Sequence, residues 1–330
     1  MSEMKTVPIA GRSLWTRDDF SAGDWINHLH ASDIADLEAA LAGVKARGLG
    51  CGDFDRNAFP LPVFGQRLAS MREELIHGRG FALLRGLPVE RLSLADIETI
   101  YWGIGTHLGT AITQNDQGDV LTHVTMHLSE PGQLAARGYQ DRRYQEPHND
   151  RADLVGLLCV RTARSGGASS IVNSASLYND ILRNHPEYLP VFYRGFRLHR
   201  GGTVVTDEPV KVFSYFMGKV YVWFSSRNIE RAVAQEGPLT AIEQAAFDYL
   251  SAIAMKPQYR LDMELQPGDI QFVSNYTVLH SRTAYEDFEE RERWRLLLRL
   301  WLNLEDQPLE PAFAKFTRRT VYPDRPLAGA

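Results

Sequence analysis

The feature that most constrains the fold is a pair of short motifs that carry metal-binding side chains far apart in the sequence. The first motif is His148-Asn149-Asp150, and the second contains His280. In an extended strand the side chains at i and i+2 point to the same side, so His148 and Asp150 can reach one point while Asn149 turns away. If His280 joins them, a strand from the middle of the chain must lie beside one from near its end, as in a rolled β-sheet.

Two imidazoles and one carboxylate form the facial triad that holds non-haem Fe(II) with open positions for O2 and a co-substrate. Pro147 fits the start of the first strand. The turn at 265–269 and the alternating residues 270–273 place a strand before His280. A His-x-Asp triplet alone is weak evidence, because a lone buried histidine is more often a structural residue than a ligand. The full set makes an iron-dependent oxygenase the leading hypothesis.

An arginine-rich run, residues 291–302, follows His280 and gives this hypothesis its context. Arg295, Leu297 and Arg299 would share one face of a strand, and the intervening leucines the other. An inward arginine is costly unless it meets an anion, and its planar fork suits a carboxylate. A 2-oxo-dicarboxylate would chelate the metal with its keto-acid end and need an arginine for its far carboxylate. The alternative is a solvated charged strand or an amphipathic helix.

Five segments, in order, resemble the taurine dioxygenase-like (TauD/TfdA) Fe(II)/2-oxoglutarate-dependent oxygenases, and the resemblance spans most of the chain. Each segment alone is unspecific, but the ordered set is specific. The segments are the early strand and turn 80–88, the first-histidine segment 145–150, the Gly-Gly stretch 166–172, the distal-histidine signature 275–285 and the strand 297–302.

The resemblance implies that His148, Asp150 and His280 are the iron ligands and that the chain uses Fe(II), 2-oxoglutarate and O2. It also implies that Arg295 pairs with the distal carboxylate of 2-oxoglutarate, and that Ser169 donates a hydroxyl to the same carboxylate. The family's own residue in taurine dioxygenase is a threonine there.

The loop between the distal histidine and the arginines is longer than in taurine dioxygenase. Arg291 or Arg293 could therefore take the role assigned to Arg295. Arg299, one strand period beyond Arg295, is expected near the substrate or the co-substrate.

The activity implied by the resemblance is oxidation of a C–H bond, with release of succinate and CO2. Related halogenases have a small residue in place of the acid, so Asp150 favours hydroxylation, or desaturation or cyclisation. Arg299 and the aromatic content point to a small carboxylate- or amino-acid-derived metabolite of secondary metabolism. Gln114 and Asn115 resemble the family's substrate-side loop, with a simple turn as the alternative. Asn275 could orient the substrate or cap the end of a strand.

Two other classes of function use the same residues. One is a non-catalytic β-roll that holds an organic acid with its arginines, and the other is a zinc hydrolase with the same three ligands. His123 and His127 could form a helical i, i+4 metal pair, but the residues around them favour a strand.

Composition agrees with one globular enzyme. A chain of 330 residues with 44% hydrophobic content can bury a large core. The net charge of −5 and the absence of a basic stripe argue against nucleic acid, and no apolar window is long enough for a membrane span. Two cysteines, without a signal peptide, favour the reducing cytoplasm. Whether the chain forms a homo-oligomer stays open.

The pattern along the chain predicts a mostly β protein with helical additions, a double-stranded β-helix or jelly roll of the clavaminate synthase type. One domain, 1–330, is expected, with a helical cover over about 1–110. Helices are expected at 32–48, 64–77, from Ser93, at 174–184 and after the capping box that begins at Thr240. Further strands are expected at 154–160 and 219–224.

Overall fold

Two β-sheets form the centre of the protein, which the computed structural model describes for residues 4–21, 23–115, 117–126, 141–201 and 204–319. The larger sheet contains β1 (Ile26–His28), β2 (Phe81–Arg85), β14 (Ile270–Ser274), β6 (Leu154–Arg161), β17 (Leu296–Asn303) and β3 (Thr110–Ala111), with β4 (Leu121–Val124) also paired to β17. The smaller sheet contains β13 (Arg260–Met263), β8 (Ser169–Asn173), β15 (Val278–Arg282) and β5 (Gln145–His148). The predicted jelly roll is confirmed.

The described residues also form three short two-stranded sheets. They are β9 (His199–Gly201) with β10 (Val204–Val205), β11 (Phe213–Phe216) with β12 (Lys219–Val222), and β7 (Ser165–Gly166) with β16 (Tyr285–Glu286).

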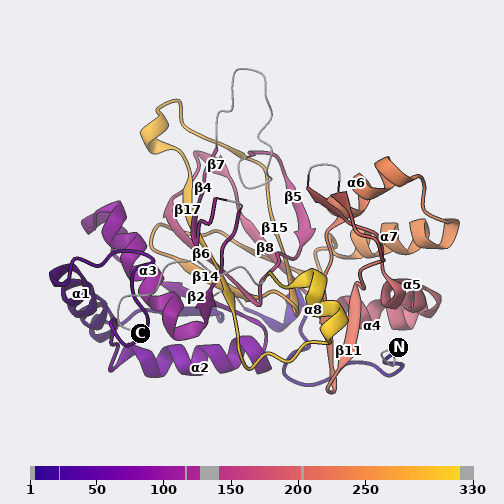
Figure 1. The fold of residues 1–330 in the computed structure, drawn as a ribbon, viewed down its shortest axis with the longest axis horizontal. Helices are drawn as coiled ribbons and strands as arrows, with labels where there is room; N and C mark the ends of the chain where they lie inside the picture. Colours follow the sequence, from indigo (N-terminus) through magenta and orange to yellow (C-terminus); the bar gives the residue numbers. More distant parts are fainter. Residues whose placement is uncertain (1–3, 22, 116, 127–140, 202–203, 320–330) are drawn as a thin grey trace.

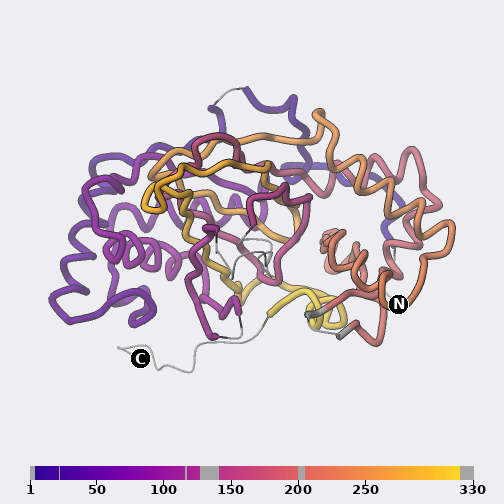
Figure 2. The backbone as a smooth tube through the Cα atoms, turned by 90° about the horizontal axis from the view of Figure 1, so that it is seen from above, coloured from indigo at the N-terminus to yellow at the C-terminus, as the bar shows by residue number. Residues whose placement is uncertain are grey.

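Helices cover the strands in two groups, which lie on opposite sides of the central sheets (Figures 1 and 2). The first group is α1 (Ala31–Ala46), α2 (Phe64–His77) and α3 (Leu94–Leu108); the second is α4 (Ser174–Asn184), α5 (Leu189–Arg194), α6 (Ser226–Glu236) and α7 (Ala241–Ile253). The short helix α8 (Pro311–Thr317) follows the last strand. Among the described residues, no helix combines the length and the apolar character needed to cross a bilayer.

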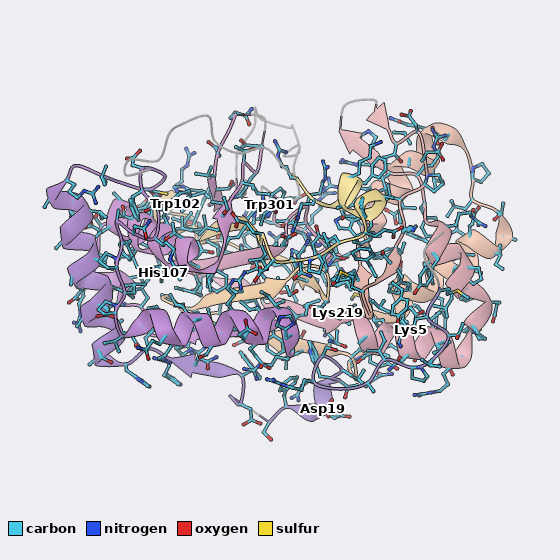
Figure 3. The ribbon with its side chains drawn as sticks, turned by 60° about the horizontal axis from the view of Figure 1, so that its bottom comes forward. Lys5, Asp19, Trp102, His107, Lys219 and Trp301 are labelled. Carbon is cyan, nitrogen blue, oxygen red and sulfur yellow. The ribbon has the colours of Figure 1, made fainter. Side chains whose placement is uncertain are left out.

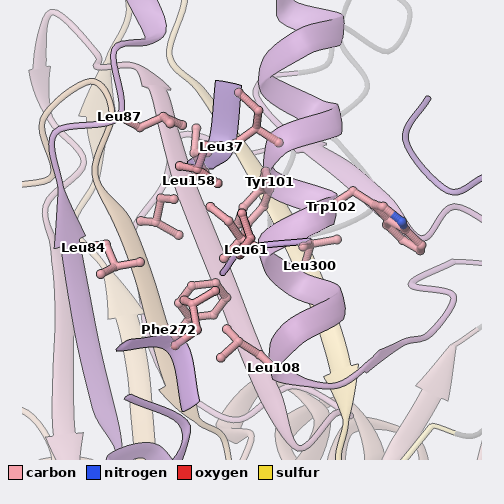
Figure 4. Close-up of a cluster of buried hydrophobic side chains, with 14 of the residues drawn as sticks. Leu37, Leu61, Leu84, Leu87, Tyr101, Trp102, Leu108, Leu158, Phe272 and Leu300 are labelled. Atoms are coloured by element: carbon pink, nitrogen blue, oxygen red, sulfur yellow. The ribbon is translucent and has the colours of Figure 1, made fainter. Parts of the chain in front are cut away.

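Each strand of the larger sheet sends alternate side chains to two different cores. Leu84, Phe272 and Leu300 pack against the first helical group, in the cluster drawn in Figure 4. Their neighbours Leu83 and Val273 pack instead between the two sheets. This alternation explains why residues 154–160 are apolar throughout, since a strand that is covered on both faces has no solvent side. Figure 3 shows Trp301 among the strands, between the two helical groups.

The expected helices are confirmed at 64–77 and 174–184, as are those that begin after Ser93 and Thr240. The strand predicted over 219–224 ends two residues earlier than expected, at Val222. Phe224 leaves the hairpin and pairs with the segment that follows β5: its N–H donates to Asn149 Oδ1, and its carbonyl accepts from Asn149 N, both at 2.9 Å. Phe224 therefore holds the segment around Asn149 in place and does not extend the hairpin of β11 and β12.

Glycines at two positions give a direct test of this packing. A Cβ added to Gly156, on β6, would lie 2.6 Å from Cε1 of Phe272, whereas a Cβ added to Gly43, on α1, meets nothing within 4 Å. We expect Gly156→Ala to lower the free energy of unfolding by about 1–3 kcal/mol through overpacking. Gly43→Ala should raise it by up to about 1 kcal/mol, because alanine favours the helix. Urea unfolding of both variants tests this, and a neutral Gly156→Ala would contradict the packing described.

Candidate active site

The smaller sheet brings together the three residues of the two motifs. β5 and β15 pair antiparallel, with His148 directly opposite His280. His148 Nε2 lies 4.0 Å from Asp150 Oδ1, and His280 Nε2 lies 3.7 Å from Asp150 Oδ2. One ligand atom from each residue falls within 4.8 Å of the others. Asn149 points away, as predicted, and donates to the carbonyls of Asn275 and Val278.

Both imidazoles are in a form that can bind a metal. His148 Nδ1 lies 2.8 Å from the carbonyl of Glu146, so we assign the proton to Nδ1, which leaves the lone pair of Nε2 directed toward Asp150. Burial lowers the pKa of His280 to about 3, so this imidazole is neutral at physiological pH. Metals bind the neutral form of histidine.

Asp150 is held as a carboxylate by its neighbours. Burial opposes its ionisation, but the charge of Arg299 and the hydrogen bond from Trp301 favour the carboxylate, and the pKa of Asp150 is lowered. Arg299 Nη1 lies 3.4 Å from Oδ2, and Trp301 Nε1 donates to the same oxygen at 2.9 Å. The main chain of Asp150 is also fixed, because Trp223 Nε1 donates to its carbonyl at 2.9 Å.

Two cavities adjoin the triad. A cavity of about 50 Å³ is lined by all three triad residues together with Ser169, Arg282, Arg295 and Arg299. A larger, open cavity of about 490 Å³ is lined by His148 and Asp150 together with Gln114, Glu146, Ser226, Arg227, Glu230, Arg299 and Trp301. Arg299 lines both cavities and therefore stands at the boundary between them.

Arg295 is the buried member of the arginine-rich run. Only 4% of it is exposed, and its Nη1 has no hydrogen-bond partner. Arg291 and Arg293 lie on the exposed turn η5 (Arg291–Arg293), where they stack on the rings of Trp294 and Phe288. As expected from the alternation, Leu298 and Leu300 face the helical core on the other side of the strand.

The residues around the small cavity fit Fe(II) and a dicarboxylic keto acid. Two imidazoles and a carboxylate are a donor set that iron(II) accepts. A buried guanidinium with an unpaired N–H needs an anion. Gly167 leaves room beside it, since a Cβ at this position, where φ is +78°, would lie 3.1 Å from Arg295 Nε.

The remaining predicted residues lie in different surroundings. Ser169 lines the small cavity, and its hydroxyl donates to Gln271 Oε1 at 2.9 Å. Gln114 lines the open cavity and accepts from Arg299 Nε at 2.8 Å. Asn115 caps a turn by accepting from the N–H groups of residues 117 and 119. Its place in the substrate-side loop stays a prediction.

Asn275 is fully buried and supports the main chain that carries the metal motif. Its Oδ1 accepts from the N–H of Asp150 at 2.9 Å, and its Nδ2 donates to the carbonyls of Asp150 and Ala152. These contacts fix the segment that carries Asp150. They engage both the oxygen and the nitrogen of the Asn275 amide with protein main chain.

Sequence reasoning missed Arg282 and Trp301. Arg282 lines the small cavity, and Trp301 donates to the triad carboxylate. Arg282 lies two residues after His280 on the same strand, so the alternation that joins His148 to Asp150 would have placed it on the metal side. His123, one of the alternative metal pair, lies on the strand β4, and its Nε2 is 2.6 Å from Oε1 of Glu98 on α3. His127 lies outside the described residues.

Comparisons with known proteins agree with this geometry. The model of the "Taurine catabolism dioxygenase TauD, TfdA family" matches residues 50–301. FR-33289 synthase of Streptomyces rubellomurinus is 34% identical over 318 residues, with 93% of each chain covered. The taurine hydroxylase-like protein SAT17 of Stachybotrys chartarum is 26% identical over 329 residues, with 91% of this chain and 82% of that protein covered.

Solved structures with the same fold include two oxygenases. Asparagine oxygenase, in complex with Fe(II), 3-hydroxyasparagine and succinate, has a TM-score of 0.66 at 17% identity, covering 84% of this chain and 93% of that one. The non-haem iron oxygenase OrfP, in complex with Fe and alpha-ketoglutaric acid, has a TM-score of 0.61 at 14% identity with the same coverage. At these identities the likeness concerns the fold.

The support given by Asn275 can be tested separately from general stability. Asn275→Ala leaves the N–H of Asp150 without its partner, so we expect a loss of about 1–3 kcal/mol in stability together with weaker Fe(II) binding. Asn179→Ala is the matched control, since Asn179 exchanges two hydrogen bonds with the main chain of Ile9 and lines neither cavity. It should lower stability without changing Fe(II) affinity. Equal Fe(II) affinities in the two variants would contradict this role.

Proposed function

Because this chain belongs to the taurine catabolism dioxygenase TauD, TfdA family, we propose that it oxidises a C–H bond of a small carboxylate- or amino-acid-derived metabolite. The protein is a 2-oxoglutarate-dependent non-haem iron dioxygenase, with Fe(II) as its cofactor and 2-oxoglutarate and O2 as co-substrates. Membership of this family sets aside the two alternative classes, an organic-acid-binding β-roll and a zinc hydrolase. We also propose that 1–330 form one such domain, with the segment before about 110 as its helical cover.

The observation that carries the site assignment is the convergence of His148, Asp150 and His280 at the end of the small cavity that also contains Arg295. We assign the three triad residues as iron ligands. Arg295 and Ser169 are assigned to the distal carboxylate of 2-oxoglutarate. When bound, Fe(II) and 2-oxoglutarate activate O2 and yield succinate and CO2 as the substrate is oxidised.

The chain's own residues prepare this chemistry. Trp301 and Arg299 orient the carboxylate of Asp150 and keep it charged, so that it can act as a ligand. His280 is buried and neutral, which keeps its nitrogen available without loss of a proton. The narrow cavity holds the co-substrate on one side of the triad, while the wide cavity leaves the other side open to an organic substrate.

The lining of the open cavity supports the proposed substrate class. Arg227 and Arg299 offer cations to a carboxylate, whereas Glu146 and Glu230 offer anions to an ammonium group. Glu230 is partly desolvated beside Glu146, and its pKa is raised. Among similar proteins, the structures of asparagine oxygenase and OrfP contain hydroxylated amino acids, and FR-33289 synthase belongs by name to a biosynthetic pathway. We propose hydroxylation, with desaturation or cyclisation as variants of the same oxidation.

The iron assignment predicts the effect of removing one ligand. His280→Ala should lose the visible charge-transfer band that forms when Fe(II) and 2-oxoglutarate are added without oxygen, and it should lose oxygen-dependent decarboxylation. His123→Ala is the matched control, because His123 pairs with Glu98 outside both cavities. It should keep both properties. Retained turnover in His280→Ala would falsify the assignment.

The carboxylate at Asp150 and the position of Arg299 predict the products and the substrate dependence. Given its substrate in high chloride, the enzyme should form an oxidised, non-chlorinated product with one succinate per turnover. Arg299→Ala should weaken the organic substrate by roughly 2–5 kcal/mol. It should weaken 2-oxoglutarate by less, because Arg295 and Ser169, which line the small cavity, remain to hold that co-substrate. Mass spectrometry over a panel of small amino acids and carboxylates measures this. A chlorinated product, or a defect confined to 2-oxoglutarate, would contradict the proposal.

A further inference from the structure

A second buried guanidinium, that of Arg282, faces the same small cavity as Arg295. Arg282 lies on β15 two residues after His280, and only 5% of it is exposed. Its Nη2 donates to the carbonyls of Asp141 and Arg143, at 2.7 and 2.5 Å. Its Nε and Nη1 are buried and have no hydrogen-bond partner. The protein therefore supplies hydrogen-bond acceptors to only one of the three guanidinium nitrogens of Arg282.

The two arginines and a tyrosine form one buried cluster. The Cζ atoms of Arg282 and Arg295 lie 4.8 and 5.0 Å from the centroid of the Tyr285 ring, so this ring contacts both cations. Burial and the neighbouring Arg295 lower the pKa of Arg282 to about 10. Burial also lowers the pKa of Arg295, and two neighbouring guanidiniums make each other more costly to bury.

The charges of this cluster do not balance within the described residues. Asp287 is buried beside Arg295, where its Oδ1 accepts from the N–H of that residue. Asp141 is already paired with Arg143 at 2.5 Å. Two cations therefore face one carboxylate, and the cluster carries a net charge of +1. A buried, unpaired charge is costly, and one further carboxylate would neutralise it.

We propose that Arg282 is a second binding residue for the distal carboxylate of 2-oxoglutarate, and that it makes the enzyme select keto acids with a second carboxylate. Ser169, already assigned to that carboxylate, is the direct partner of Arg282 across β8 and β15. The carboxylate would lie between Arg282, Arg295 and Ser169, which all line the 50 Å³ cavity. This inference rests on the proposed function, since it extends the site for the same co-substrate.

A purely structural role for Arg282 makes a different prediction. Its two bonds to the carbonyls of Asp141 and Arg143 tie the segment before β5 to β15. If this were its whole contribution, its loss would disturb the triad and weaken every keto acid alike. A role in binding the distal carboxylate affects only those keto acids that possess one.

The test compares 2-oxoglutarate with 2-oxopentanoate, which has the same chain length but ends in a methyl group. Each is titrated without oxygen into the Fe(II)-loaded protein, and the visible charge-transfer band gives the affinity. Arg282→Gln removes the charge but keeps an amide that can donate to the two carbonyls. It should weaken 2-oxoglutarate by roughly 10- to 100-fold and change 2-oxopentanoate by less than about twofold.

Succinate and butyrate form a second pair of probes, measured by calorimetry on the metal-free protein. Here too, Arg282→Gln should weaken the diacid and leave the monoacid unchanged. Arg295→Gln should behave in the same way, whereas Arg293→Gln is the matched control. Arg293 is exposed on the turn η5 and lines neither cavity, so its loss should alter neither pair of ligands.

Equal weakening of the diacids and the monoacids in Arg282→Gln, or no weakening of either, would overturn the inference. If Arg282→Gln fails to fold, Arg282→Lys decides instead. It keeps the charge but loses the planar fork, so it should weaken 2-oxoglutarate by a smaller factor and leave 2-oxopentanoate unchanged. Absence of the charge-transfer band in the wild-type protein with both keto acids would count against the proposed function itself.

Discussion

The pairing of β15 with its two neighbours is the constraint on which the rest of the site depends. β15 lies between β5 and β8, and its register places His280 opposite His148 on one side and Arg282 opposite Ser169 on the other. A shift of one residue would turn both inward side chains of β15 away from the cavity. One strand therefore brings both His280 of the triad and Arg282 to the same cavity.

The site consists of buried charges that are stabilised in unequal measure. Asp150 has Arg299 and Trp301 as partners within the protein, so its charge is supported before any ligand binds. Arg282 and Arg295 line the small cavity, and each keeps N–H groups without a hydrogen-bond partner. This difference separates residues that maintain the geometry from those that await a ligand. Burying the two guanidiniums is unfavourable, and the folded protein has already buried them. An anion that pairs with them in the proposed site therefore removes part of this unfavourable free energy.

Much of the candidate site followed from local patterns in the sequence. The i and i+2 spacing placed His148 and Asp150 together. The family resemblance and the R-x-x-x-R spacing of Arg295 and Arg299 favoured Arg295 over the arginines before it. The exposed turn that carries Arg291 and Arg293 could not be foreseen, because helix, turn and strand patterns overlap in a run so rich in arginine. Nor could the contacts of Asn275, since a buried amide that bonds main chain leaves no periodic signal.

The sequence by itself determined the elements, the ligand types and the family, because these depend on local spacing and residue chemistry. Tertiary structure decided which distant groups share a cavity. The pairing of Asn149 with Phe224, the bond from Trp301 to Asp150 and the position of Arg282 beside Arg295 all join segments far apart in the chain. Such contacts arise from strand register and sheet packing, which no short stretch of sequence specifies on its own.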